Sequence, residues 1–406
     1  MADAMPDIRL ILDSQELRAA ASVFRQAMFG LPGGVTPVEH WVEKYIVPGR
    51  VYGAWLNGTL AGTTNSFLSE LTLPGGESVA HAAVTHVGVL PHFTRRGVLQ
   101  KLFRQQLEDL HQEGISVATL RASQGAIYPR FGYGVASAFQ NLRIDKRELT
   151  TLPKLEDEVQ LLPAADAWQA VQEIVARYPL SRAGTLTRWP QWWAMQQHRL
   201  EHSNLNHYVV LALKEGIPQA FVRYHAQPDD NWLYSTERTL VVDDFHAACP
   251  ELAVTLFNYL LQLDIARFVQ LPHRPVDDVL PLMLDNPRAI VQQGLWDETW
   301  LRIISLEHTL NARRYQDAPP VVIAVTDALL PVNQGNWLIS SESVKRTTQL
   351  ADLSLDSATL AMLLLGGHKV WQLIQARRIQ IINPQAPKRL ERLLACDEAP
   401  WSGIFF

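Results

Sequence analysis

The stretch HVGVLPHFTRRGVL, residues 86–99, carries the strongest signal in this sequence. Apolar residues run up to Leu90 and predict the end of a strand, whereas the amphipathic run 98–110 predicts a helix. The basic turn between them, residues 94–97, contains a glycine. A strand that enters a helix through such a turn points several backbone N–H groups and the positive end of the helix dipole at one spot. The stretch therefore predicts a phosphate-binding site.

The turn supplies both charge and backbone donors for a pyrophosphate. We expect Arg95 and Arg96 to donate charge-assisted hydrogen bonds, together with the amides of Gly97, Val98 and Leu99. Gly97 has no side chain to keep a phosphate away from the backbone. The alternative is an ordinary strand–helix turn with two solvated arginines.

The strand before the turn offers its backbone to an extended, amide-containing arm of the same cofactor. Val87 and Val89 share one face of this strand, and Gly88, on the other face, adds no bulk. We therefore expect the cofactor to lie along Val87, Gly88 and Val89 before it reaches the turn.

Tyr128 lies downstream in the segment IYPRFGYG, residues 127–134. A phenol has an ordinary pKa near 10 and can protonate a thiolate leaving group. The alternative is a core tyrosine whose hydroxyl finds a backbone partner.

Length and composition limit the classes of protein. With 406 residues the chain predicts two or three domains, and 47% hydrophobic and 19% charged residues are typical of a globular protein. A net charge of −5 excludes a general nucleic-acid binder. Cys249 and Cys396 indicate no disulfide scaffold. Without a signal-peptide pattern or an apolar run of about 18 residues, we expect a cytoplasmic protein with no membrane span.

The segments before and after the opening stretch predict further elements. We expect a helix over residues 8–30, capped at Ser14, and a hairpin over residues 51–68 that turns at Asn57-Gly58. Residues 356–366 predict a helix that ends at glycine.

A second α/β unit follows and predicts an internal repeat. A hairpin over residues 208–224, a strand at 239–242 and a helix at 252–263 align with the first unit at an offset of 154, without a gap. The basic turn then becomes Cys249-Pro250-Glu251. Because proline removes a backbone donor and glutamate repels phosphate, we expect the second unit to keep the fold and not to bind the cofactor.

Other polar groups give weaker signals. The 13 histidines show no metal-ligand spacing, and no Ser/His/Asp set has supporting context. Asp243-Asp244 and Asp277-Asp278 are expected to cap turns. We therefore expect no metal site.

Taken together, these segments resemble the GNAT N-acetyltransferases and, more narrowly, the enhanced intracellular survival (Eis) family of bacterial acetyltransferases. Thr94 and Leu99 depart from the usual GNAT turn, and the Eis branch tolerates leucine at the latter position. The resemblance implies an α/β chain of three domains. These are a catalytic GNAT domain over residues 1–150, a degenerate GNAT-like domain over 151–297 and a domain similar to sterol carrier protein over 298–406.

The resemblance also implies a mechanism. Acetyl-coenzyme A would lie along Val87–Val89 and Arg95–Leu99, with Ser123 in contact, and a backbone N–H of Val87 or Val89 would polarise the thioester. Tyr128 would be the general acid. The general base would be the terminal carboxylate of Phe406, an ordinarily weak base that an apolar surround would strengthen.

The implied acceptor is a small-molecule amine of the aminoglycoside or lysine type. Candidate contacts are Phe29, Glu39, Trp41 and Phe405, and the family's penultimate position can be acidic where Phe405 stands here. The resemblance further implies a homo-oligomer, a hexamer. The alternative is a protein that binds an apolar ligand or lipid and retains a vestigial acetyltransferase site.

Overall fold

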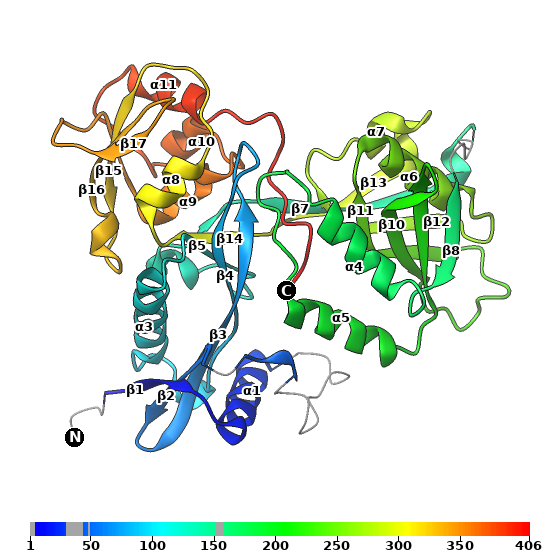
Figure 1. The fold of residues 1–406 in the computed structure, drawn as a ribbon, viewed down its shortest axis with the longest axis horizontal. Helices are drawn as coiled ribbons and strands as arrows, with labels where there is room; N and C mark the ends of the chain where they lie inside the picture. Colours follow the sequence, from blue (N-terminus) through cyan, green and yellow to red (C-terminus); the bar gives the residue numbers. More distant parts are fainter. Residues whose placement is uncertain (1–4, 30–43, 48, 152–157) are drawn as a thin grey trace. The chain divides into compact units, whose positions relative to one another are not determined.

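A computed structural model describes residues 5–29, 44–47, 49–151 and 158–406 of the chain (Figure 1). Two compact units form. The first comprises residues 1–137, 181–195 and 297–406, and the second comprises residues 138–180 and 196–296. Among the described residues, no helix is long and apolar enough to cross a membrane.

The first unit contains a seven-stranded sheet in the order β1-β2-β3-β4-β5-β14-β6. Its strands are β1 (Asp7–Ile11), β2 (Val51–Leu56), β3 (Thr59–Thr72), β4 (Ser78–Val89), β5 (Val117–Leu120), β14 (Trp300–Ile303) and β6 (Gly134–Val135). Helix α1 (Ser14–Met28) packs on the face of β4 that carries Gly88, and α3 (Val98–Gln112) packs on the opposite face, against Gly62 of β3. The predicted hairpin is confirmed, since β2 and β3 flank Asn57-Gly58.

The start of the chain differs from the sequence prediction. The expected helix over 8–30 divides into β1, which pairs with β2, and α1, which begins at Ser14. The N-cap is Asp13, whose side chain accepts hydrogen bonds from the N–H groups of Gln15 and Glu16. Pairing with β2 therefore overrides the helical pattern before this cap.

The first unit also contains a five-stranded sheet in the order β17-β16-β15-β18-β19. Its strands are β15 (Val321–Thr326), β16 (Gly335–Ile339), β17 (Val344–Arg346), β18 (Leu353–Asp356) and β19 (Gln380–Ile381), and its helices are α8 (Leu306–Ala312), α9 (Ser357–Leu364), α10 (Val370–Gln375) and α11 (Ala386–Leu393). Helix α9 begins after Asp356, which accepts a hydrogen bond from the N–H of Thr359, and Gly366 follows its end. A buried ion pair between Arg302 of β14 and Asp327 ties the two sheets of this unit together, with nitrogen–oxygen distances of 2.7 Å.

The second unit contains a seven-stranded sheet in the order β13-β7-β12-β11-β10-β9-β8. Its strands are β7 (Ala138–Asp145), β8 (Val159–Pro163), β9 (His207–Lys214), β10 (Ile217–Ala226), β11 (Thr239–Ala247), β12 (Phe268–Pro275) and β13 (Ile290–Asp297), and its helices are α4 (Trp168–Arg177), α5 (Pro190–Glu201, which continues from the first unit), α6 (Pro250–Gln262) and α7 (Leu280–Met283). The core forms between this sheet and α6.

The predicted repeat is visible in β4–α3–β5 and β11–α6–β12. Both helices bury the same pattern of residues at an offset of 154, for example Leu102 and Leu256, and both strand pairs are parallel. The gap-free alignment is wrong in the turn, however. Eight residues separate β4 from α3, whereas two separate β11 from α6, because α6 already begins at Pro250.

Candidate active site

Strands β4 and β5 diverge and leave a backbone edge open. They pair in parallel only from His81 with Val117 to Ala83 with Thr119, and β4 then continues to Val89. A β-bulge interrupts the pairing of β4 with β3 near His86, whose φ is +50°. Bulges of this kind bend a strand and redirect its backbone groups. The result is a gap between two parallel strands, beside the basic turn.

The open edge presents the N–H groups that the sequence analysis singled out. The N–H of Leu90 donates to the carbonyl of Ala61 on β3, at 2.8 Å. Because N–H groups of a strand alternate between its two edges, the N–H of Gly88 also points to β3, and those of Val87 and Val89 point to the open side.

The basic turn forms the N-terminus of α3. Gly97 is the N-cap with φ of +75°, a conformation that glycine adopts without strain, and Arg95 has φ of +64°. The first helical hydrogen bond runs from the N–H of Lys101 to the carbonyl of Gly97, so the preceding amides of the helix have no partner within it. The first turn of α3 contains no acidic residue. These groups are suited to an anion.

Both arginines of the turn are exposed, as is Gly97. Arg96 lies 5.6 Å from the ring of Phe93, and within the described chain neither Arg95 nor Arg96 has an ion pair or side-chain hydrogen bond. A Cβ atom built on Gly97 meets nothing within 4 Å. The predicted phosphate cradle, which consists of Arg95, Arg96 and the amides of Gly97, Val98 and Leu99, is therefore one continuous turn with both cations exposed, while the side chain of Val98 is buried.

Gly88 has a packing reason for its small size. A Cβ at this position would lie 2.9 Å from Cβ of Ala27 and 3.1 Å from Cα of Phe24, both on α1. Glycine here thus lets α1 approach β4, on the face opposite Val87 and Val89.

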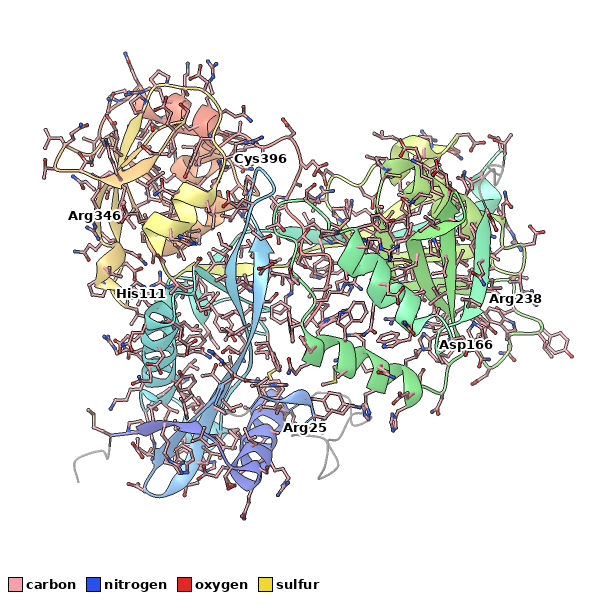
Figure 2. The ribbon with its side chains drawn as sticks, viewed as in Figure 1. Arg25, His111, Asp166, Arg238, Arg346 and Cys396 are labelled. Carbon is pink, nitrogen blue, oxygen red and sulfur yellow. The ribbon has the colours of Figure 1, made fainter. Side chains whose placement is uncertain are left out.

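Half-buried His86 faces the same helix, since its ring lies 4.9 Å from that of Phe24. Burial, and then the charge of Arg25 on α1 (Figure 2), lower the pKa of His86 to about 4. His86 is therefore neutral at physiological pH.

Tyr128 begins the short turn Tyr128–Phe131, one segment after β5 and after exposed Ser123. Its ring is buried near those of Phe103, Tyr133 and Trp300, at 6.0 to 6.2 Å. Its hydroxyl has no hydrogen-bond partner among the described residues. Burial raises the pKa of Tyr128 to about 12. The group therefore stays protonated at neutral pH, where it can donate a hydrogen bond and cannot act as a base.

The end of the chain is anchored beside the end of β5 by Arg121, which the sequence analysis missed. Its guanidinium donates to the hydroxyl of Ser402 at 2.5 Å and to the carbonyl of Ile404 at 2.7 Å. It also lies 5.2 Å from the ring of Phe406. Buried Glu298 accepts the N–H and hydroxyl of Ser402, so a buried network holds the tail.

Residues 181–195 pack against the other side of the C-terminal residues 402–406. The indole N–H of Trp192 donates to the carbonyl of Phe405 at 2.9 Å, and the ring of Trp189 meets that of Phe406 at 5.4 Å. The N–H of Leu186 donates to the carbonyl of Ser402. The tryptophan-rich run WPQWW, residues 189–193, was the available sequence signal for this contact.

The structure shows no ring contact between Phe29 and Phe405, the two candidate acceptor residues that lie within its described part. Phe405 is half-exposed beside Arg121, and Phe29 is 98% exposed at the end of α1. Trp41 and Glu39 lie outside the described residues.

Comparison with known proteins bears on all three parts of the chain. An acetyltransferase (GNAT) domain matches residues 8–136, a second acetyltransferase (GNAT) domain matches residues 184–303, and a sterol carrier protein domain matches residues 306–403. Tandem GNAT domains followed by a sterol-carrier-like domain are thus established for this chain.

Individual relatives agree over nearly the full length. An uncharacterized N-acetyltransferase of Streptomyces coelicolor is 33% identical over 93% of this chain and 94% of its own. N-acetyltransferase Eis of Mycobacterium tuberculosis is 27% identical over 81% of each chain. The crystal structure of Eis1 from Mycobacterium abscessus matches with a TM-score of 0.92 and 38% identity, over 98% of this chain and all of that one. The chain belongs to the Eis family of GNAT N-acetyltransferases.

Proposed function

We propose that this enzyme transfers the acetyl group of acetyl-coenzyme A directly to a small-molecule amine. GNAT acetyltransferases use this co-substrate. The observation that carries the proposal is the open edge of β4, which leads directly into exposed Arg95 and Arg96 at the start of α3. A thioester with an amide-containing arm and a pyrophosphate requires such an edge and such a turn, in that order.

The residues around the cradle have separate tasks. Val87 and Val89 donate backbone hydrogen bonds, and one of these two N–H groups stabilises the oxyanion at the thioester carbonyl. Gly97, Val98 and Leu99 contribute amides to the pyrophosphate, and Ser123, which is exposed shortly after the end of β5, is the further proposed contact.

Tyr128 is the proposed general acid. Its hydroxyl donates a proton to the sulfur of the departing coenzyme A thiolate. A thiol titrates near 8.5, whereas burial holds the pKa of Tyr128 at about 12. The phenol is therefore protonated at every pH at which the reaction would run.

The terminal carboxylate of Phe406 is the proposed general base, which takes a proton from the acceptor amine. The tail is held by Arg121 and Trp192 through the carbonyls of Ile404 and Phe405. Neither bond uses the terminal carboxylate, which has no ion pair or hydrogen bond within the part of the chain that the structure describes. The rings of Trp189 and Phe406 exclude water from one side, and an apolar surround makes a carboxylate a stronger base.

The acceptor is proposed to be an amine of the aminoglycoside or lysine type, with Phe405, Phe29 and Trp41 as contacts. Aromatic faces attract ammonium groups. The phenylalanine at the penultimate position favours acceptors with fewer charges. A homo-oligomer, of hexameric form, is the proposed assembly, and light scattering of the purified protein measures it.

A thiol-release assay over a panel of amines, with and without a C-terminal extension, tests the function. We expect turnover of at least one amine by the native chain and a loss of about 100-fold or more in kcat when residues are added after Phe406. The matched control carries the same extension before residue 1. Full activity of the C-terminally extended protein would show that the carboxylate is not the base.

Binding is measured separately by thermal unfolding. Acetyl-coenzyme A at about 100 times its Kd stabilises a binder by about 2.7 kcal/mol. If millimolar acetyl-coenzyme A gives no stabilisation, the proposed cradle is wrong.

A further inference from the structure

Three potential metal ligands meet on one face of the second unit's sheet. They are His207 on β9, His225 on β10 and Asp243 on β11, and one ligand atom from each lies within 4.8 Å of the others. The expectation that the histidines hold no metal-ligand arrangement rested on linear spacing. These ligands are 18 residues apart along the chain, and only strand pairing brings them together.

Sheet register explains why these three residues converge. His225 lies directly opposite His207 in the pairing of β10 with β9, and opposite Val241 in the pairing with β11. The next pairs, Tyr224 with Val242 and Arg223 with Asp244, leave Asp243 as the extra residue of a β-bulge. Bulges re-aim side chains and often lie beside functional sites. The expectation that Asp243-Asp244 caps a turn is therefore wrong, because both residues lie within β11.

The donor atoms already point at one another. Nδ1 of His207 lies 2.7 Å from one oxygen of Asp243, and Nδ1 of His225 lies 2.8 Å from the other. Burial raises the pKa of Asp243, but the hydrogen bonds from the two imidazoles outweigh it and hold the pKa at about 2. The site thus presents a carboxylate and two imidazoles.

Ser203 is a hydrogen-bond partner of the cluster that is not itself a proposed metal ligand. The hydroxyl of Ser203 lies 2.9 Å from Nε2 of His207. Metal-binding histidines regularly donate their second N–H to such a group, which fixes the ring. A hydroxyl both donates and accepts, so this contact survives the tautomer change that frees Nδ1 for a metal.

The same residues also have the order of a Ser–His–Asp set, but two contacts favour a ligand site. The hydroxyl of Ser203 accepts the N–H of Leu205 at 3.1 Å, which closes a local turn. Asp243 is shared between two imidazoles and does not serve one base.

We propose that His207, His225 and Asp243 bind one divalent cation of the zinc class. Two imidazole nitrogens and one carboxylate oxygen suit Zn²⁺ or Ni²⁺ better than Mg²⁺ or Ca²⁺. Metal–ligand distances of about 2.0–2.1 Å place tetrahedral ligand atoms about 3.3 Å apart, so the contact between the bound carboxylate oxygen and its histidine lengthens by about half an ångström, and the other imidazole turns from the second oxygen to the metal. Nε of Arg223, 3.9 Å from Asp243, opposes the cation and limits the affinity.

Calorimetric titration of the full chain with Zn²⁺, after removal of metals by EDTA, tests the site. We expect one Zn²⁺ per chain and a rise in the unfolding temperature. Ser203→Ala weakens binding by about 10–100-fold, as loss of an outer partner does, and His225→Ala weakens it further. Arg223→Gln tightens binding because a nearby positive charge is removed.

The chain offers a matched control in His198 and His202, which form a second group with Glu201 at the end of α5. The double variant His198→Ala/His202→Ala retains the binding event. Unfolding in EDTA shows whether each variant is folded, and the Co²⁺ absorption spectrum reports the ligand set directly. The proposal is overturned if the wild type takes up no Zn²⁺, or if His225→Ala binds as tightly as the wild type.

Discussion

The two copies of the strand–turn–helix unit share a scaffold and differ where chemistry would occur. Helices α3 and α6 bury equivalent residues, and both preceding strands carry a bulge. In the first copy eight residues connect the strand to the helix, and two exposed arginines lie among them. In the second copy two residues make this connection, and the helix begins with Pro250 and Glu251. The comparison indicates that buried residues can keep a fold while the turn before the helix changes in length and charge, and we predict that the short turn binds no phosphate.

The bulges differ in the same way. His86 occupies the bulge of the first copy and packs against α1, and Asp243 occupies that of the second and bonds two histidines. A β-bulge therefore occurs in both copies with different polar residues and different contacts, because strand register and the packed helix place different neighbours beside each bulge.

The largest expected effect concerns Tyr128, the proposed acid, which follows the first copy; Leu282 stands at the corresponding position of the second. Tyr128→Phe lowers kcat by about 10²–10⁴-fold, since proton donation is lost, and leaves the unfolding temperature near that of the wild type. Steady-state kinetics and thermal unfolding measure both quantities. Tyr133→Phe is the matched control, because its ring packs in the same cluster and its buried hydroxyl has no partner in the described chain. Equal losses in the two variants would rule out Tyr128 as the acid.

A smaller effect is expected from the cations of the turn. Arg95→Ala and Arg96→Ala each raise KM for acetyl-coenzyme A by about tenfold, since each removes a charge-assisted hydrogen bond. Assay with an acetylated pantetheine that lacks the pyrophosphate provides the comparison. The variants and the wild type should use this truncated substrate equally well, and a persistent difference would place the arginines elsewhere in the mechanism.

The bulge residue of the first copy makes stability depend on pH. The pKa of His86 in the folded chain, about 4, lies below its ordinary 6.5, so protonation favours the unfolded state. The contribution of this group is nearly complete by pH 7.5 and falls by about 2.5 kcal/mol as the pH drops to 4.5. His86→Asn, which tolerates positive φ, should remove that share of the loss in denaturant unfolding at both pH values. An unchanged pH dependence would contradict the assignment.

The smallest expected effect is in the second copy. Glu251→Arg leaves the Kd for acetyl-coenzyme A unchanged, because the short turn offers no cradle for a pyrophosphate whatever its charge. The reference value is the Kd of the Tyr128→Phe protein for acetyl-coenzyme A, measured by equilibrium binding, because we expect this variant still to bind the co-substrate. Appearance of a second binding site would show that charge, and not loop length, disabled this copy.

Much of the fold could be predicted from local patterns. The hairpin at Asn57-Gly58, the helix predicted over residues 356–366 and the register of the two helices each depend on neighbouring residues, and each is confirmed. The start of the chain could not be predicted from its helical pattern, since strand β1 depends on its partner β2. The domain boundaries at residues 150 and 297 stay predictions.

The features of the candidate site likewise divide into those set by nearby residues and those set by contacts between distant parts of the chain. The sequence by itself determined the basic turn and its glycine, because turn geometry and helix dipoles act within about a dozen residues. The role of Tyr128 rests on the family resemblance and stays a prediction. Only the tertiary structure decided that β14 lies beside β5, that Arg121 holds Ser402 and Ile404, and that two histidines meet Asp243. These contacts join residues that are far apart along the chain, and strand register and buried hydrogen bonds, which no linear spacing encodes, determine them.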